Sequence, residues 1–242
     1  RANQAFSNTV LWDLIPNFAI NNMQVVAGSN PVYGLNTLGG SMSMQTKSGR
    51  DFKKKNVDVS YGSWARSSSL VEMGGMVGDS NMDYYVGYEH FTENGWRKFS
   101  PSHVNQLFGK IGFESEMSRY ELSYTGADNI LIGNGLTPKD LLGAERDGIH
   151  TLEDETKNEY GQLALNMSHF FDEQTMLSGN IYYKRSDRST FNGDLNDEFC
   201  DGDSYDEDEC TEAQLAMSKS DAENLNEGVI NRTATFQDVY GL

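Results

Sequence analysis

Apolar and polar residues alternate along short stretches of the chain from about Lys55 onward. A period of two is typical of β-strands with one apolar face, because successive side chains of a strand point to opposite sides. The pattern occurs in eight stretches, at residues 57–61, 71–77, 82–88, 107–113, 120–124, 163–167, 177–183 and 233–242. The sequence therefore predicts a sheet of about eight strands with an apolar face and a polar face.

The connections between these stretches alternate between short and long. Turn-forming residues join the second stretch to the third, the fourth to the fifth and the sixth to the seventh, at 79–80, 115–116 and 172–173. The other connections lengthen along the chain, from 64–65 to 93–102, 130–156 and 189–230. Short turns at one edge and long loops at the other are typical of a transmembrane β-barrel. A large soluble antiparallel sheet is the alternative that the strand pattern alone leaves open.

Strand length and tyrosine positions agree with a membrane wall. Each stretch extends over roughly ten residues, the length that a tilted strand needs to cross the hydrocarbon layer. The apolar face would then meet lipid, and the polar face would line a wet lumen. Tyrosines at the predicted strand ends would form the interfacial aromatic girdle; these are Tyr61, Tyr84, Tyr124, Tyr160 and Tyr183.

Charge and composition narrow the function classes. The chain has 19 Lys and Arg against 36 Asp and Glu, a formal charge of −17. Nucleic acid is excluded as a partner, since phosphate binding needs a basic surface. The sequence contains no apolar run of about 18 residues, so it predicts no membrane-spanning helix. An exported protein needs a signal peptide and none begins at Arg1, so we expect further sequence before it; residues 239–242 resemble an interrupted strand.

Residues 1–50 follow a different pattern, which glycines punctuate. The run IPNFAINNMQVVAGSNPVYGLNTLGGSMSMQTKSG contains strand-like segments at 23–26 and 41–47. It has neither Gly-x-Gly-x-x-Gly nor Gly-Lys-Ser/Thr at the start of a helix, so it does not predict phosphate binding. Its glycines suit tight turns and close backbone approach. The residues that define the motif are Gly28, Pro31, Tyr33, Gly34, Gly39 and Gly40.

This motif resembles the end of the plug domain in TonB-dependent outer-membrane receptors. The runs NGWRKFSPSHVNQLFGKIGFE and NGDLNDE resemble loop and strand segments of the ferric-siderophore and ferric-citrate members. The resemblance implies an all-β transmembrane barrel, 22-stranded in the family, that encloses an α+β plug domain. It assigns residues 1–50 to the C-terminal part of the plug and residues 51–242 to the N-terminal part of the barrel with its extracellular loops. The family's energy-coupling box and remaining strands are absent from this sequence.

The resemblance also implies a function. The expected activity is energy-coupled import of a ferric chelate, a siderophore or ferric citrate, across the bacterial cell outer membrane. The chelate would bind at the extracellular mouth and pass after displacement of the plug. The implied partners are a TonB-type energy-transducing protein of the inner membrane, outer-membrane lipid and the chelate itself, with no cofactor. No nucleophile and base are paired in the sequence, so we do not expect an enzyme.

The connection at 189–230 is strongly acidic and contains the only two cysteines, Cys200 and Cys210. In an oxidising compartment, two cysteines this close most simply form a disulfide, which would stabilise the loop by about 3 kcal/mol. A two-thiolate zinc site would need further Cys or His ligands. The carboxylates are interpreted as a solvated surface; the alternative is a calcium site without the central glycine, whose candidate ligands are Asp201, Asp203, Glu207, Glu209 and Glu212.

A second hypothesis comes from another functional class. A soluble, acidic β-sheet binding module, calcium-dependent through the acidic loop, would carry the same strand pattern. Such a module would bury its apolar side chains in a dry interior, whereas a membrane wall would expose them on one face. The placement of these side chains therefore separates the two hypotheses.

Overall fold

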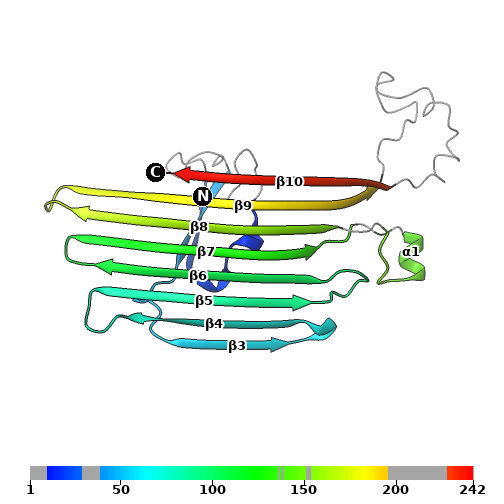
Figure 1. Ribbon diagram of the computed structural model, residues 1–242, viewed down its shortest axis with the longest axis horizontal. Coiled ribbons are helices and arrows are strands. Elements are labelled where there is room, and N and C mark those ends of the chain that lie inside the picture. The colour runs from blue at the N-terminus through cyan, green and yellow to red at the C-terminus, as the bar shows by residue number, and fades with distance from the viewer. Residues whose placement is uncertain are drawn as a thin grey trace, which may run out of the picture.

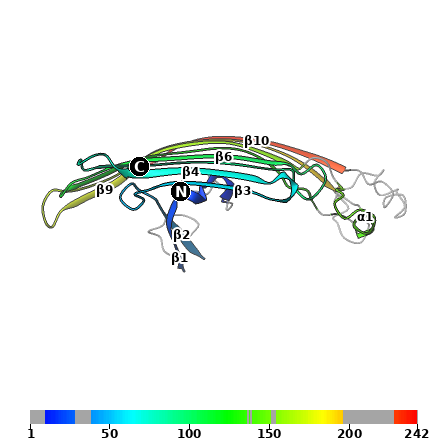
Figure 2. The same ribbon diagram turned by 90° about the horizontal axis from the view of Figure 1, so that it is seen from below.

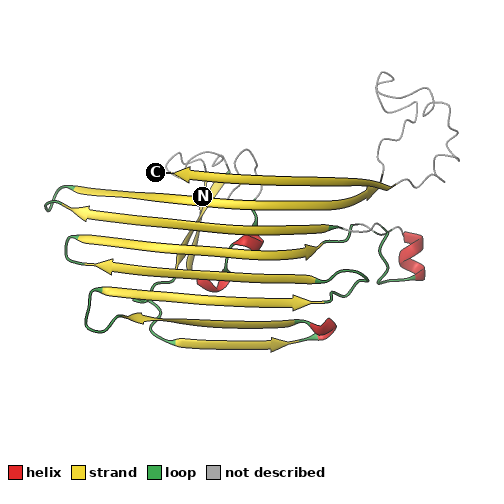
Figure 3. Cartoon of the chain, viewed as in Figure 1, coloured by secondary structure: helices red, strands yellow, loops and turns green. Residues whose placement is uncertain are grey.

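The computed structural model describes residues 10–28, 39–135, 137, 139–150, 154–195 and 228–241, and Figure 3 shows that strands dominate them. Two sheets are present (Figure 1). The smaller sheet pairs β1 (Ile20–Ala27) with β2 (Gly40–Thr46). The larger sheet is an antiparallel meander in the order β3 to β10. Its strands are β3 (Lys55–Tyr61), β4 (Ser67–Met76), β5 (Met82–Glu93), β6 (Ser102–Glu114), β7 (Ser118–Ile132), β8 (Glu155–Phe170), β9 (Met176–Leu195) and β10 (Gly228–Gly241).

Short helices accompany these strands. Two 3-10 turns, η1 (Trp12–Leu14) and η2 (Asn17–Ala19), precede β1. A third, η4 (Ser63–Ala65), lies between β3 and β4, and the α-helix α1 (Lys139–Ala144) lies between β7 and β8. None of the helices in the described part of the chain is long and apolar enough to span a bilayer.

Each of the eight predicted strands is present, and several are longer than the roughly ten residues expected. Strand β9 has 20 residues and β8 has 16. The sequence underestimates them because both faces become polar near the long loops while the backbone pairing continues, as between Asp128 and Glu159. The connection predicted at 130–156 is consequently confined to residues 133–154.

The large sheet is curved, and β1 and β2 project from its concave side (Figure 2). The register places the apolar positions of neighbouring strands opposite one another on the other, convex side. Many of these side chains are exposed; Ile111 retains 52% of its accessible surface and Leu163 retains 47%. One continuous row crosses five strands and consists of Tyr84, Ile111, Leu122, Leu165 and Ile181.

Polar residues occupy the alternate, concave positions. Glu72, Asp83, Gln106 and Lys110 are among them, and all four are buried. Burial of so many polar side chains is unusual unless they have hydrogen-bonding partners. Those partners come from the segment that precedes β3.

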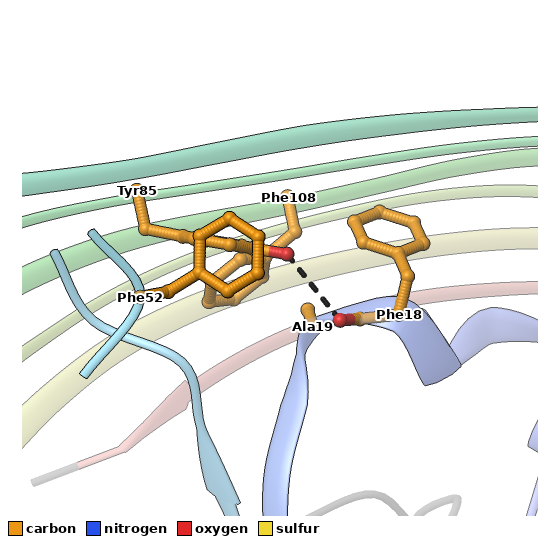
Figure 4. Close-up of a cluster of buried hydrophobic side chains, with 5 residues drawn as sticks. All are labelled: Phe18, Ala19, Phe52, Tyr85 and Phe108. Atoms are coloured by element: carbon orange, nitrogen blue, oxygen red, sulfur yellow. Dashed lines mark hydrogen bonds between the residues drawn. The ribbon is translucent and has the colours of Figure 1, made fainter. Parts of the chain in front are cut away.

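One apolar cluster packs the segment that precedes β3, here called the N-terminal segment, against the large sheet, here called the wall (Figure 4). Phe18 and Ala19 of η2 and Phe52 before β3 lie against Tyr85 of β5 and Phe108 of β6. The Phe52 and Tyr85 rings meet edge to face at 5.4 Å between centroids. The Tyr85 hydroxyl shares its one hydrogen between the Phe18 carbonyl oxygen at 3.3 Å and a carboxylate oxygen of Glu72 at 2.6 Å, which satisfies a polar atom inside the cluster.

A second cluster corrects one sequence-based expectation. Leu11 and Leu14 pack with Ala127, and Tyr160 packs against them. The predicted place of Tyr160 in an outer aromatic girdle is therefore wrong, because its register with Ala127 turns the ring to the concave side. Tyr124 and Tyr183 do lie on the convex side, but in the middle of β7 and β9 rather than at their ends.

Candidate functional site

The residues after β2 attach to the concave face through a buried ion pair. The Lys47 ammonium donates to Glu72 Oε2 at 2.7 Å, and the Tyr85 hydroxyl donates to the same oxygen at 2.6 Å. The Asn56 amide donates to the other carboxylate oxygen at 3.2 Å. The Lys47 ammonium also lies 4.7 Å from the centre of the Phe52 ring, within the range of a cation–π contact. Each polar atom of the Glu72 carboxylate thus has a partner in the N-terminal segment or the wall.

A second group of contacts lies a few residues further on. The backbone N–H of Gly49 donates to Asp83 Oδ1 at 2.9 Å. The Arg50 guanidinium bridges Asp83 at 3.1 Å and Glu114 at 3.2 Å. The Lys110 ammonium donates to the Thr46 carbonyl oxygen at 3.3 Å. These bonds join residues 46–50 to β5 and β6.

Asp13 forms the third attachment. Its carbonyl oxygen accepts from the Gln106 amide at 2.6 Å and from the Asn129 amide at 2.7 Å. Its carboxylate accepts from the Asn158 amide at 2.8 Å. Asn129 and Asn158 are fully buried. One residue of η1 therefore contacts β6, β7 and β8 at the same time.

Next to Asp13, towards the long loops, the concave face is hollow; we call this the lumenal hollow. It has a volume of about 670 Å³. Asp154 fixes its rim, since its carboxylate accepts from the backbone N–H of Gly135 at 2.7 Å and of Gly193 at 2.9 Å. Arg188 also lines it, and the Nε atom of Arg188 is buried without a hydrogen-bond partner among the described residues. The lining is Asp13, Ser102, Leu131, Ile132, Gly133, Asp154, Thr156, Arg188, Thr190, Phe191, Asn192, Asn231 and Thr233.

The lumenal hollow has the size and the polar groups of a ligand-binding site. Its size falls within the usual range of small-molecule sites, roughly 300–1,000 Å³. Its hydroxyls, amides and the buried guanidinium nitrogen offer hydrogen-bond donors to oxygen atoms of a ligand. In the described part of the chain, no three His, Cys, Asp or Glu side chains converge as a metal site would need.

Three of the predicted motif glycines lie in the described part, at the end of the β1–β2 hairpin where the chain connects its two strands. Gly28 has a φ of 90° and Gly40 a φ of 147°, a backbone region that favours glycine. A Cβ atom on Gly40 would lie 2.7 Å from the Val26 carbonyl oxygen. Gly39 accepts a backbone bond from Gly28 at 3.4 Å, which closes the hairpin.

The other predicted site residues lie outside the described residues. They are Pro31, Tyr33 and Gly34 of the glycine motif, Cys200 and Cys210 of the predicted disulfide, and Asp201, Asp203, Glu207, Glu209 and Glu212 of the candidate calcium loop. The structure therefore brings none of these together with the lumenal hollow.

Sequence reasoning missed the residues that attach the N-terminal segment. Asp13, Asn129 and Asn158 carry no local motif, and their association spans more than a hundred positions of the chain. One signal was present: Tyr85 breaks the alternation of β5 by placing an aromatic ring among the polar positions Asp83 and Gly87. A large ring on a polar face indicates that another segment covers it.

Comparison with known proteins gives likeness in structure alone. No family model matches the chain, and no curated protein does. The siderophore receptor PiuA from Acinetobacter baumannii matches 74% of this chain with a TM-score of 0.59 and 16% identity. The ferric-catecholate import receptor Fiu from E. coli K12, in a closed form, matches 92% with a TM-score of 0.60 and 13% identity.

The match covers only part of each neighbour. This chain aligns with 28% of the PiuA chain and 32% of the Fiu chain, so it spans about a third of their length. Both neighbours are receptors, and at 13–16% identity the likeness to them shows the fold alone. The curved meander has the fold of part of a β-barrel, which confirms the predicted all-β barrel fold.

Proposed function

We propose that this chain is part of an energy-coupled importer that carries a ferric chelate, a siderophore or ferric citrate, across the bacterial outer membrane. In this proposal residues 1–50 belong to a plug and residues 51–242 to the wall of a barrel. The chelate enters from the side of the long loops, binds above the plug in the lumenal hollow, and passes when the plug is displaced. The partner that displaces it is a TonB-type energy-transducing protein of the inner membrane.

The observation that carries the proposal is the division of the large sheet into two faces. Exposed apolar rows cover the convex side, and buried polar residues cover the concave side, where the N-terminal segment lies. A soluble binding module would need the opposite arrangement, with its apolar side chains in a dry interior. A wall with lipid outside and a filled lumen inside requires the arrangement seen here.

The convex side also has a polar margin towards the long loops. Towards the long loops, the apolar row of Tyr124, Leu163 and Tyr183 is followed first by a row that contains Leu107, Gly126, Gly161 and Arg185, and then by a polar row. That row crosses β4 to β9 and consists of Ser69, His90, Asn105, Asp128, Glu159 and Asp187. A change from apolar to charged side chains along a strand supports a boundary between hydrocarbon and water at this level. The long loops then lie beyond that boundary, on the exterior side of the proposed receptor.

The chemistry of the attachment supports a plug that moves. The N-terminal segment is held by two small apolar clusters and by hydrogen bonds that single residues of the segment, such as Asp13 and Lys47, make to the wall. A large dry interface would resist displacement, whereas hydrogen bonds next to a wet lumen can exchange with water. The donors in the lumenal hollow, including Arg188, suit an oxygen-rich chelate.

Uptake of radiolabelled ferric citrate and of a radiolabelled ferric catecholate by cells with the intact receptor tests the proposal. We expect saturable uptake of one of them, and its loss when the energy-transducing partner is deleted. Arg188→Gln serves as the site variant, with Arg185→Gln on the convex side of the same strand as its matched control. Uptake that is unchanged by deletion of the partner rejects the proposal.

A further inference from the structure

Two exposed tryptophans lie in a cleft among the connections at the long-loop edge. The cleft has a volume of about 540 Å³ and is lined by Trp64, Trp96, Arg146 and Asp147. Trp64 belongs to the connection between β3 and β4, and Trp96 to the connection between β5 and β6. Arg146 and Asp147 follow α1. The cleft shares no lining residue with the lumenal hollow, so it is a separate surface.

Arg97 holds two of these connections together. Its guanidinium donates to the carbonyl oxygens of Asn134 at 3.1 Å, Gly135 at 2.9 Å and Gly148 at 3.1 Å. It also donates to the Thr137 hydroxyl. One side chain thereby joins the loop that carries Trp96 to both ends of the loop that carries Arg146 and Asp147. A cation with several carbonyl acceptors fixes such loops in one arrangement.

Backbone bonds complete the frame around the cleft. The Lys98 N–H donates to the Asp147 carbonyl oxygen at 2.9 Å, and the Asn94 N–H donates to the Trp64 carbonyl oxygen at 2.9 Å. The ammonium of Lys98 pairs with Glu145, and this hydrogen bond raises the pKa of Lys98. All three connections are therefore linked before any ligand arrives, which lowers the entropy lost on binding.

Trp64 has a backbone conformation that favours glycine. Its φ is 56°, and that of the neighbouring Ala65 is 54°. Non-glycine residues with such values are uncommon and occur preferentially at functional sites. The Trp64 side chain is 60% exposed and that of Trp96 is 51% exposed, so neither indole is needed for a core. Their position in the cleft indicates that they serve a ligand.

We propose that this cleft binds an uncharged saccharide. A sugar ring presents C–H groups on one face, which pack on the electron-rich face of an indole. Its hydroxyl groups both donate and accept, so they can pair with the Asp147 carboxylate and the Arg146 guanidinium together. The adjacent cation and anion leave the cleft without net charge, and an anionic chelate gains little there. Its volume lies within the range of small-ligand sites, roughly 300–1,000 Å³.

Binding of defined oligosaccharides to the full-length receptor tests the proposal. The receptor is purified in an amine-oxide detergent, which has no sugar headgroup. The probes are maltohexaose, as a dissolved neutral glucan, and the neutral outer-core oligosaccharide of the source cell's own lipopolysaccharide, freed of lipid, acidic sugars and phosphate. Saturation-transfer NMR and tryptophan fluorescence report binding. We expect saturable binding of at least one probe, and which probe binds identifies the dissolved or the surface-anchored source.

Matched variants separate the cleft from general effects of exposed aromatic residues. Trp64→Ala and Trp96→Ala are each expected to weaken binding about tenfold, the loss of one ring contact, whereas Trp96→Phe retains a ring and most of the affinity. Phe99→Ala is the control, since Phe99 is 70% exposed in the same connection but does not line the cleft. The proposal is overturned if neither probe saturates the native receptor, or if Phe99→Ala weakens binding as much as Trp96→Ala.

Discussion

Gly87 shows how one missing side chain lets the N-terminal segment approach the wall. It lies in β5 between Glu72 and Phe108 of the flanking strands. A Cβ atom at this position would lie 2.5 Å from the Phe18 ring. Glycine within a strand is typical where another segment comes close.

Gly87→Ala should push Phe18 away from the wall and destabilise its attachment by about 1–3 kcal/mol, the usual cost of overpacking. Gly109→Ala is the matched control, because its Cβ atom would have its nearest neighbour at 4.0 Å. Hydrogen exchange of residues 16–20 in the intact receptor measures the effect. Equal exchange in the two variants would show that Phe18 does not depend on this contact.

Asp172 controls a turn at the opposite edge of the sheet. Its Oδ1 atom accepts from the backbone N–H of Gln174 at 2.8 Å and of Thr175 at 2.7 Å. The bond from the Gln174 N–H is the largest cause of a lowered pKa for the Asp172 carboxyl, with Thr175 adding to it. A lowered pKa in the folded state means that the ionised carboxylate stabilises the folded turn.

This stabilisation is present above the carboxyl's unfolded pKa and is lost as the pH falls through the lower, folded value. Asp172→Ala should therefore reduce the melting temperature of the receptor at neutral pH, and the difference should shrink under strongly acidic conditions. Glu173→Ala, at the exposed neighbouring carboxylate, is the control. A difference between Asp172→Ala and the native receptor that is independent of pH would contradict this account.

At the scale of elements, η1 is a short turn that bonds to three strands of the wall. Its residue Asp13 accepts from side chains of β6, β7 and β8. Because η1 has only three residues, its own backbone bonds contribute little to its stability. The order of residues 11–19 therefore depends on the wall.

Asp13→Ala should leave the buried Asn158 amide without its acceptor, at a cost of about 2 kcal/mol. The backbone amides of residues 12–15 and 17–19 should then exchange roughly 30-fold faster, while those of β7 and β8 change little. Asp128→Asn, on the convex side of β7, should leave this exchange as it is. A uniform increase across the sheet would instead mean that Asp13 stabilises the whole wall.

The strands could be predicted from the sequence, but the attachment of the N-terminal segment could not. Alternation in Met82, Tyr84, Val86 and Tyr88 identifies β5 and its faces, because side-chain direction in a strand follows from local geometry. The burial of Tyr85 depends on Phe18, 67 positions earlier. No local pattern encodes such a contact.

The limits of the long connections were predicted less well for a related reason. Where both faces of a strand are polar, as near Asp128 and Asn129, alternation disappears although the backbone remains paired. The lumenal hollow combines residues of η1 and of strands β6 to β10, and the tryptophan cleft combines residues of three connections. Their existence follows from the order of strands in the sheet, which spacing along the chain does not specify.

For the whole molecule, the convex face is the surface that decides where the protein resides. Its apolar rows cross β4 to β10, and the first charged side chains towards the long loops are Arg185 and Asp238, one row before the polar margin. A charged residue within such rows would face hydrocarbon, whereas one at the margin would face water.

Leu165→Arg should therefore impair insertion of the full-length receptor into phospholipid vesicles by about 2–4 kcal/mol. Glu159→Arg, six residues away on the same face of β8, should have a small effect. Urea titration of folding, followed by gel mobility of unheated samples, measures both. If the two variants insert equally well, the convex face does not meet lipid.

The bond between Asp13 and Asn158 also constrains the order of assembly. It joins residues 145 positions apart. The chain entropy lost on closing so large a loop is offset only when the acceptor and the donor are both in place. Asp13 thus lacks its bond to Asn158 until β8 has been added beside β7. During that interval Leu11 and Leu14 lack their contact with Tyr160 of β8, and in the proposed receptor a chaperone that shields apolar segments would have to protect them.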